Sequence, residues 1–317
     1  MIDWGKTAFL FPGQGSQLVG MGQDFVAAYP AALAVFEQAE LWLGFNLRDI
    51  CFHGPETALN DTSNTQPALY THSAAILRVL RDELPQARPA YVAGHSMGEL
   101  TALFAAGAMT FEDGLTLVRA RGKAMKAAGE KSPGAMAAVL GLESPVVQEI
   151  CATATVQVGR PVVLANDNCP GQVVISGDNQ ALDLAMQAAT EKGAKRVVKL
   201  PISIASHSPL MAAAAADFGK AVDATPFQTP QIPVYANITA APLTAVADIR
   251  PELKGQLTQP VRWTESMQAL IAAGVTTFIE IGSGEVLSGL IKRIGRDQVR
   301  VTLNSVAALQ VFVAANR

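Results

Sequence analysis

Cysteine is scarce in this sequence, and the three cysteines (Cys51, Cys151 and Cys169) show neither CxxC spacing nor any other spacing typical of a metal site. An odd, scattered set does not make a disulfide framework and is typical of a reducing compartment. Basic residues are outnumbered too, with 24 Lys and Arg against 27 Asp and Glu and no basic run. We therefore expect no general nucleic-acid binding.

Long hydrophobic runs are also missing. No apolar stretch reaches the roughly 18 residues of a membrane-spanning helix, and residues 1–5 lack the basic and apolar regions of a secretory signal. We expect a cytoplasmic protein that does not bind membranes. Half of the 317 residues are hydrophobic, which is enough for a large core and for two domains, or for one domain with an insert.

Short apolar segments alternate with helical patterns through most of the chain. This alternation is typical of a parallel sheet covered by helices on both faces. The expected strands are residues 7–11, 90–93, 232–236, 277–281 and 299–303. Ligands then belong at the carboxyl ends of the strands, where we expect the loops around positions 14, 96, 207 and 282.

Residues 130–201 follow a different order of elements. The expected elements are residues 135–140, 145–154, 162–165, 172–176, 179–192 and 196–200. Their βαββαβ order is typical of the ferredoxin-like fold. We therefore predict an α/β protein whose large domain comprises residues 1–129 and 202–317, with residues 130–201 as an inserted subdomain.

Two loops are expected from turn-forming residues. Residues 60–65 are polar, and the next helix is expected to open at Gln66, with Pro67 in its first turn. Residues 166–171 are expected to form the turn between two strands of the insert. Thr110, with Asp113 three residues later, is expected to cap a further helix.

A Gly-x-Ser-x-Gly motif at Gly94, Ser96 and Gly98 follows an apolar run and precedes an Ala/Leu-rich helical pattern. Strand, sharp turn and helix is the context of a nucleophile elbow, in which the glycines allow close backbone approach. The alternative is a glycine-flanked serine in an ordinary tight turn. In an elbow, the N–H of Met97 lies at a helix N-terminus, where it can stabilise an oxyanion.

A nucleophilic serine needs a base, and the chain has only four histidines. His95 is adjacent to the serine and should diverge from it, His72 lies in a helical pattern, and His53 lies in a Gly/Pro loop. His207 lies in a polar loop between a strand and a helix and is the candidate by elimination. The alternative is a loop histidine with a local hydrogen bond.

A glycine-rich loop at residues 12–17 follows the first strand. It does not match the dinucleotide fingerprint, because Leu18 stands where the third glycine would be. Its backbone N–H groups could bind an anion, and the alternative is a plain turn. Arg119 and Arg121 lie about 200° apart on a predicted helix, so periodicity does not say which one faces inward.

In combination, these motifs resemble the malonyl-CoA:acyl carrier protein transacylases, the acyltransferase family of fatty-acid and polyketide synthesis. The resemblance extends from about Thr7 to Asn304, with Met97 where leucine is more usual. The matching segments are residues 11–17 (Phe-Pro-Gly-Gln-Gly-Ser-Gln), 65–69 (Thr-Gln-Pro-Ala-Leu), 94–99 (Gly-His-Ser-Met-Gly-Glu), Arg121-Gly122, 168–172 (Asn-x-Pro-Gly-Gln) and Ser206-His207. The family fold, an α/β-hydrolase-like domain with a ferredoxin-like insert, agrees with the predicted order of elements.

The resemblance implies a catalytic role for five residues. Ser96 would be the nucleophile, and His207 would be the general base and then the general acid. A main-chain carbonyl orients the histidine in this family, and the matching residue is Gln256. The oxyanion hole would be formed by the backbone N–H groups of Gln14 and Met97.

The resemblance also selects Arg121 as the substrate arginine. A guanidinium binds a carboxylate through two hydrogen bonds, and malonyl ends in a carboxylate whereas acetyl does not. Gln66 would help to line the pocket, or else serve only as a helix N-terminal residue.

The implied reaction is ping-pong transfer from malonyl-CoA through Ser96 to the phosphopantetheine thiol of an acyl carrier protein, with no metal or redox cofactor. The oligomeric state is open, with a monomer as the default.

Three alternatives stay open at this stage. Ile204-Ala205-Ser206-His207 is similar to the Tyr-Ala-Ser-His of methylmalonyl-selective polyketide enzymes. A thioester hydrolase would share Ser96 and His207 but would need no substrate arginine. A non-catalytic carrier-protein scaffold would need neither Ser96 nor His207. An acidic carrier protein would dock on a basic face, and two clusters qualify, one at Lys292, Arg293, Arg296 and Arg300 and one at Lys123, Lys126 and Lys131.

Overall fold

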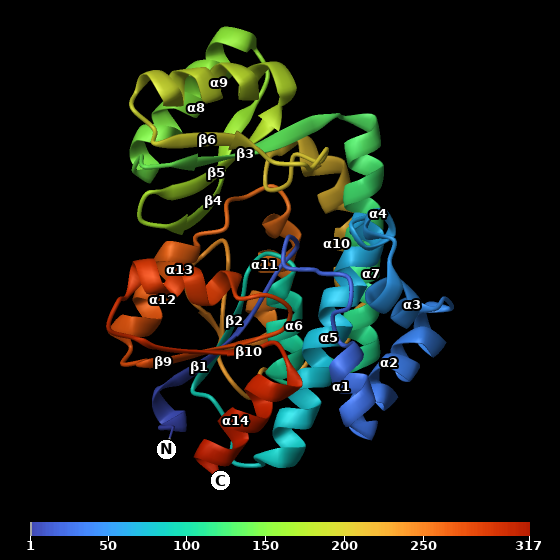
Figure 1. Cartoon of the computed structure of the whole chain (residues 1–317). Helices are drawn as coiled ribbons and strands as arrows, with labels where there is room; N and C mark the ends of the chain where they lie inside the picture. The colour runs from blue at the N-terminus through green and yellow to red at the C-terminus, as the bar shows by residue number, and fades with distance from the viewer. Residues whose placement is uncertain (1) are drawn as a thin grey trace.

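A six-stranded sheet forms the centre of the large domain in the computed structural model, which describes residues 2–317 (Figure 1). The strand order is β10-β9-β1-β2-β7-β8, and all neighbours pair in parallel except β7 and β8. The strands are β1 (Thr7–Phe11), β2 (Tyr91–Gly94), β7 (Val234–Tyr235), β8 (Pro242–Leu243), β9 (Thr277–Ile281) and β10 (Val299–Leu303). The five strands predicted for this sheet are confirmed, and β8 has no counterpart among them.

Both faces of this sheet are buried, because alternate side chains of each strand point to opposite sides. From β1, Phe9 and Phe11 pack into the core on one face, whereas Ala8 and Leu10 pack into the core on the other.

The small domain is a four-stranded antiparallel sheet with strand order β4-β5-β3-β6. Its elements in chain order are β3 (Gly134–Leu140), α8 (Ser144–Val158), β4 (Val162–Cys169), β5 (Gln172–Asp178), α9 (Asn179–Glu191) and β6 (Arg196–Lys199). The predicted βαββαβ order is confirmed, and with it the fold class. Helices α8 and α9 cover the outer face of this sheet, and its other face turns toward the large domain (Figure 1). The domain limits at 130 and 201 stay a prediction.

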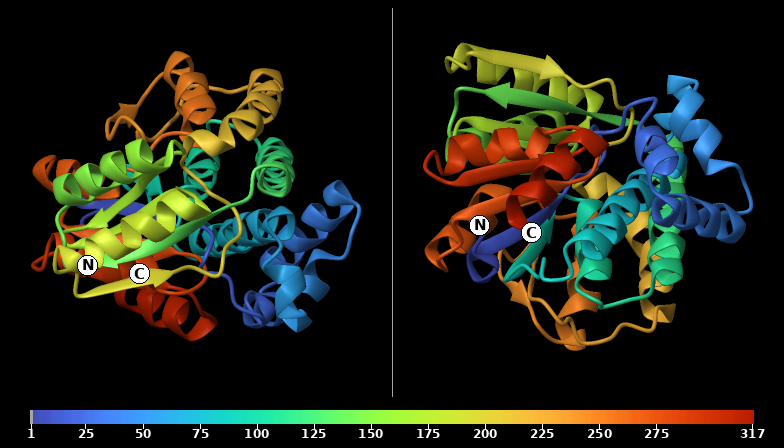
Figure 2. Two further views of the ribbon diagram at one scale, coloured as in Figure 1. Left: turned by 90° about the horizontal axis from the view of Figure 1, so that it is seen from above. Right: turned by 60° about the horizontal axis from the view of Figure 1, so that its bottom comes forward.

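The remaining helices surround the large sheet, and both chain ends lie together on the side away from the small domain, as the right view of Figure 2 shows. Ile2 N donates to Asn316 Oδ1 there at 2.9 Å. Within residues 2–317, no helix has the length and apolar character needed to cross a membrane. The helices are α1 (Gln23–Ala28), α2 (Pro30–Leu43), α3 (Leu47–His53), α4 (Glu56–Leu59), α5 (Thr62–Glu83), α6 (Gly98–Ala105), α7 (Phe111–Lys131), α10 (Ala212–Ala224), α11 (Val246–Gln256), α12 (Trp263–Ala272), α13 (Val286–Ile294) and α14 (Val306–Asn316), with short 3₁₀ turns η1 (Trp4–Lys6) and η2 (Pro209–Met211).

Helix α5 begins at Thr62, so the predicted turn at 60–65 and the predicted start at Gln66 are wrong. Pro67 lies inside the helix, where its missing N–H leaves the carbonyl of Ser63 without the usual partner. Arg119 of α7 donates to that carbonyl from Nη1. The neighbouring helix thus supplies the bond that proline removes, and the helix continues through it. The cap of α7 is as predicted, since Thr110 Oγ1 accepts from the N–H of Asp113 at 3.1 Å.

Strand β4 continues to Cys169, so the turn predicted at residues 166–171 is wrong for most of its length. Only Pro170 and Gly171 turn the chain, and two register shifts interrupt the pairing of β4 with β5. The polar side chains of the strand bind the large domain. Asn168 Oδ1 lies 2.8 Å from His95 Nε2, and Thr264 Oγ1 donates to Asp167 Oδ1 at 2.6 Å. Polarity here marks an interface between the two domains.

Candidate active site

Ser96 lies in the sharp turn between β2 and α6, with a positive φ of 52°. This conformation is uncommon and strained for a residue that carries a Cβ. A Cβ on Gly94 would lie 1.9 Å from the carbonyl of Gly98, and a Cβ on Gly98 would lie 2.1 Å from the carbonyl oxygen of Phe11. Only glycine fits at both flanks, and the predicted strand, sharp turn and helix are confirmed.

The Ser96 hydroxyl contacts His207. Ser96 Oγ lies 2.8 Å from His207 Nε2, and His207 Nδ1 lies 2.8 Å from the main-chain carbonyl oxygen of Gln256. A carbonyl oxygen only accepts, so Nδ1 carries the proton and Nε2 is free to take the proton of the serine. Burial, and then the charge of Arg121, lowers the pKa of His207 to about 3. The imidazole is therefore a neutral base at physiological pH.

Asn237, which the sequence analysis did not select, holds the serine turn in place. Its Oδ1 accepts from the N–H of Ser96 at 2.7 Å, and its Nδ2 donates to the carbonyl of Gly94 at 2.8 Å. One buried amide thus ties both sides of the strained turn to the end of β7. A single polar residue after a short strand gave no motif by which to recognise this role.

Arg121 is the inward-facing arginine and is only 1% exposed. Its Nη2 donates to Ser96 Oγ at 3.1 Å and to Gln256 Oε1 at 2.9 Å. Burial lowers the pKa of Arg121 to about 10, and the carboxyl of Glu99 opposes this shift, so the side chain is still a cation at neutral pH. Arg119 faces away from Ser96, binding Ser63 and stacking on Phe45 at 4.8 Å.

The remaining donor of the guanidinium points at sulfur. Arg121 Nη1 and Gln66 Nε2 each lie 3.3 Å from Met125 Sδ, and the buried Gln66 Oε1 has no partner within residues 2–317. A thioether is a weak acceptor, so a strong acceptor such as a carboxylate would improve the bonding of Arg121. Gln66 is thus buried behind the cavity, beside the arginine, and is not among the residues that line the cavity, so its expected place in the lining is not borne out.

A cavity of about 210 Å³ opens at the serine, between the small sheet and the strand ends of the large one. Its lining includes Ser96, His207, Arg121 and Gln14, and from the small sheet Met136 and Val174. Within the described residues, no backbone or side-chain acceptor pairs with the N–H groups of Gln14 and Met97. No group of three or more His, Cys, Asp or Glu in residues 2–317 could hold a metal ion.

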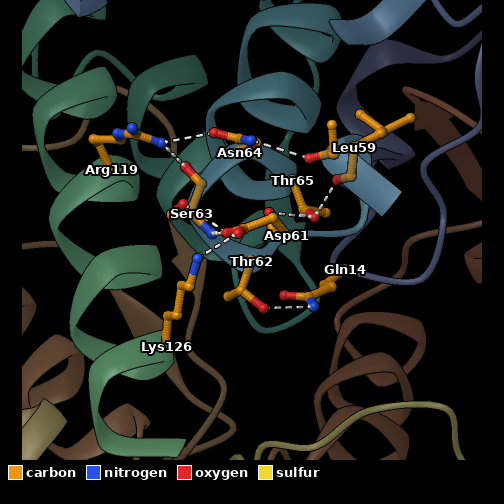
Figure 3. Close-up of polar contacts among 10 residues, drawn as sticks. Gln14, Leu59, Asp61, Thr62, Ser63, Asn64, Thr65, Arg119 and Lys126 are labelled. Carbon is orange, nitrogen blue, oxygen red and sulfur yellow. Dashed lines mark hydrogen bonds and ion pairs between the residues drawn. The ribbon is translucent and has the colours of Figure 1, made fainter. Parts of the chain in front are cut away.

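A polar cluster fixes the start of α5 against α7 and against the Gln14 loop (Figure 3). Gln14 Nε2 donates to Thr62 Oγ1 at 3.1 Å, and Lys126 forms an ion pair with Asp61 at 2.5 Å. The side chain of Gln14 therefore anchors a loop that lines the cavity. Because Asp61 neutralises Lys126, the basic cluster at Lys123, Lys126 and Lys131 is less cationic than its sequence suggests.

Comparison with known proteins gives consistent matches along the chain. Residues 8–309 match the model of the acyl transferase domain family. The malonyl CoA-acyl carrier protein transacylase of Bacillus subtilis is 42% identical over 97% of this chain and 96% of its own length. The transacylase of Escherichia coli K12 is also 42% identical, over 96% of this chain and 97% of its own.

Solved structures agree with the sequence matches. The crystal structure of the malonyl-CoA:acyl carrier protein transacylase of Xanthomonas oryzae has a TM-score of 0.93 and 44% identity over 99% of both chains. A malonyl-transacylase solved in complex with its type II polyketide synthase acyl-carrier protein has a TM-score of 0.94 and 38% identity, over 98% of this chain and all of that one.

Proposed function

The chain belongs to the malonyl-CoA:acyl carrier protein transacylases of the acyl transferase domain family, and from this premise we propose that Ser96 carries a malonyl group from malonyl-CoA to the phosphopantetheine thiol of an acyl carrier protein. The family predicted from the motifs is confirmed, and the enzyme is an S-malonyltransferase. One observation supports the proposed roles above all: the buried guanidinium of Arg121 lies 3.1 Å from the hydroxyl of Ser96.

Acylation begins with proton transfer from Ser96 Oγ to His207 Nε2, which lies within hydrogen-bonding distance. Oγ attacks the thioester carbon, and the developing oxyanion is stabilised by the N–H groups of Gln14 and Met97. The C–S bond then breaks, and His207 returns the proton to the CoA thiolate. The main-chain carbonyl of Gln256 stabilises the imidazolium that exists between these steps.

Transfer to the carrier repeats these steps in the opposite direction. His207 takes the proton of the phosphopantetheine thiol, and the thiolate attacks the malonyl ester of Ser96. The ester C–O bond breaks, the malonyl thioester leaves with the carrier, and the proton returns to the serine. Removing a single oxyanion donor typically lowers kcat by about 10²–10³, so both N–H groups matter in each half of the cycle.

Arg121 selects an acyl group that ends in a carboxylate. Malonyl presents two oxygens to a guanidinium that otherwise bonds a thioether, and charge-assisted bonds of this kind are about twice as strong as neutral ones. Acetyl leaves the guanidinium without this partner. Ile204 lines the cavity, and direct competition between malonyl-CoA and methylmalonyl-CoA would measure how well the site excludes the branched acyl group. A preference for methylmalonyl would overturn the substrate assignment.

Intact-protein mass spectrometry after mixing with malonyl-CoA tests the mechanism. We expect a malonyl adduct on the wild-type enzyme that disappears on addition of holo-acyl carrier protein, and no adduct on Ser96→Ala. The same adduct on Ser96→Ala would refute the assignment of the nucleophile. Loss of the adduct at the same rate without carrier protein would indicate a hydrolase.

We propose that the carrier protein docks beside α13, whose Val286, Leu287 and Leu290 line the cavity. Arg293 binds Gln172 Oε1 and the carbonyl of Pro170, whereas Lys292 is exposed and forms no salt bridge within residues 2–317. Lys292→Glu should raise the KM for carrier protein and leave acylation by malonyl-CoA unchanged. The same change at Lys220, which pairs with Asp217 on α10, is the control. An unaltered KM for carrier protein in Lys292→Glu would mean that the carrier protein docks on another surface.

We also propose that the protein is located in the cytoplasm. The three cysteines are buried and unpaired, which is compatible with a reducing compartment.

A further inference from the structure

Two buried glutamates lie beneath the site and take no part in the chemistry described above. Glu99 is in the first turn of α6, directly after the Ser96 elbow, and Glu252 is on α11, one turn before Gln256. They are 0% and 2% exposed. Buried carboxyl groups are costly unless they are bonded or protonated, so the bonds of each oxygen indicate what the pair does.

Glu99 uses both oxygens as acceptors. Its Oε1 accepts from the backbone N–H of Asn237 at 3.0 Å, and its Oε2 accepts from Nε2 of Gln256. A carboxyl group can accept on both oxygens whether or not it is ionised, so Glu99 binds the Asn237 N–H and the Gln256 amide at the same time.

Glu252, by contrast, uses only one of its oxygens as an acceptor. Its Oε1 accepts from the N–H of Ile238 at 2.7 Å, while its Oε2 has no donor within residues 2–317. Burial raises the pKa of both groups, and for Glu99 the neighbouring Glu252 adds to the rise. Both shifts favour the protonated form, so the pair favours one proton shared between the two carboxyl groups.

Gln256 connects this pair to the substrate arginine. Its Nε2 donates to Glu99 and to the carbonyl of Ser96, and its Oε1 accepts from Nε and Nη2 of Arg121 at 3.2 and 2.9 Å. An amide has one acceptor end, and reversing it would aim an NH₂ group at a guanidinium. Glu99 and the carbonyl of Ser96 together fix which way the amide points, and the amide helps to hold Arg121 in position.

We propose that Glu99 is a positioning residue for acyl-group selection: it accepts from the Gln256 amide and orients that amide so that Arg121 is held ready for a carboxylated acyl group. The inference rests on the proposed malonyl transfer and adds a residue that touches neither substrate nor the reacting atoms. It acts on Arg121 through a side chain, whereas His207 is oriented by the main chain of Gln256.

The test is the ratio of kcat/KM for malonyl-CoA to kcat/KM for acetyl-CoA in Ser96 acylation. In Glu99→Gln, the new NH₂ group must face either the NH₂ of Gln256 or the N–H of Asn237. Either clash disturbs the amide that holds Arg121, so the ratio should fall about 10-fold to 100-fold, the effect of losing a hydrogen bond to a charged group. Glu252→Gln supplies an N–H where the shared proton was, and its ratio should stay within about threefold of wild type.

A matched control is Glu280→Gln, which removes a buried carboxylate that accepts from the N–H groups of Leu287 and Ser288 at 3.0 and 2.7 Å. It should lower stability as Glu99→Gln does, without changing the ratio. If Glu99→Gln does not fold, Gln256→Leu replaces it in the test. This variant keeps the main-chain carbonyl that accepts from His207, and it should lower the ratio to a similar extent. The double variant Glu99→Gln/Gln256→Glu restores an acceptor toward Arg121 and should regain part of it.

The outcomes separate this inference from the proposed function. Wild-type enzyme that takes no malonyl refutes the proposed function itself. Wild-type enzyme with a high ratio that persists in both Glu99→Gln and Gln256→Leu refutes the positioning role alone. An equal fall in kcat/KM for malonyl-CoA and acetyl-CoA would also refute the positioning role, because a merely structural defect would give that result. A ratio as low in Glu252→Gln as in Glu99→Gln would refute it as well.

Discussion

Asn237→Ala should uncouple the serine elbow from the strand that supports it. The substitution removes the acceptor 2.7 Å from the N–H of Ser96 and the donor 2.8 Å from the carbonyl of Gly94. It leaves the backbone N–H of residue 237, which binds Glu99, in place. The lesion is therefore confined to the two bonds that hold the turn.

Two magnitudes follow from this geometry. A buried group left without its partner costs about 1–3 kcal/mol, so losing both bonds should lower the free energy of unfolding by about 2–6 kcal/mol. The positive φ of Ser96 stores about 1–3 kcal/mol of strain that only its surroundings maintain. If the turn relaxes by that amount, kcat for acylation should fall about 5-fold to 150-fold. The KM for malonyl-CoA should change little, because Arg121 keeps its own partners.

Urea unfolding and stopped-flow acylation would measure the two effects. Asn304→Ala is a matched control, since its Nδ2 donates to the carbonyl of Gly284 at 3.0 Å in an exposed position. Wild-type acylation in a clearly destabilised Asn237→Ala would refute the idea that this amide maintains the reactive turn. An unchanged free energy of unfolding would show that the two buried hydrogen bonds do not contribute the stability assigned to them.

Three further results are expected. Because the pKa of His207 is lowered to about 3, the rate of acylation by malonyl-CoA should be nearly flat from about pH 5 to 8, and a fall centred near pH 6.5 would contradict this. Burial lowers the pKa of His72 to about 4, and neither ring nitrogen has a partner within residues 2–317. The unfolded state then binds the proton first, so stability is complete above about pH 6.5 and is lost as the pH falls toward 4, by up to about 3 kcal/mol. His72→Gln should flatten that slope in urea titrations at several pH values, and an unchanged slope would assign it to other groups. Arg119→Met leaves the carbonyl of Ser63 without its donor and should lower the free energy of unfolding by about 1–3 kcal/mol, whereas full stability would mean that α5 tolerates Pro67 unaided.

The regular elements were predictable because their sequence patterns are local. β1, β9 and β10 begin and end where the apolar runs predict. The serine turn was equally predictable, since Gly94 and Gly98 satisfy a steric need that their neighbours in the sequence create.

Errors arose where a distant residue replaced a local signal. Pro67 normally marks a helix start, but α5 continues through it because Arg119, 52 positions later in the sequence, binds the freed carbonyl. Asn168 belongs to a run typical of a turn, yet it extends β4 because its side chain meets His95 across the domain interface.

The sequence by itself determined the order of elements, the strained turn at Ser96 and, through its combined motifs, the family. Helical spacing left Arg119 and Arg121 open, because it gives relative directions but not the direction of the core; the resemblance selected Arg121, and the tertiary structure shows that it is the one facing the serine. Only the tertiary structure brought Asn237 and Glu99 to the site, from positions 138 residues apart in the chain. Neither position carries a local pattern, since a buried amide or carboxylate has a role only through the partners that folding brings to it.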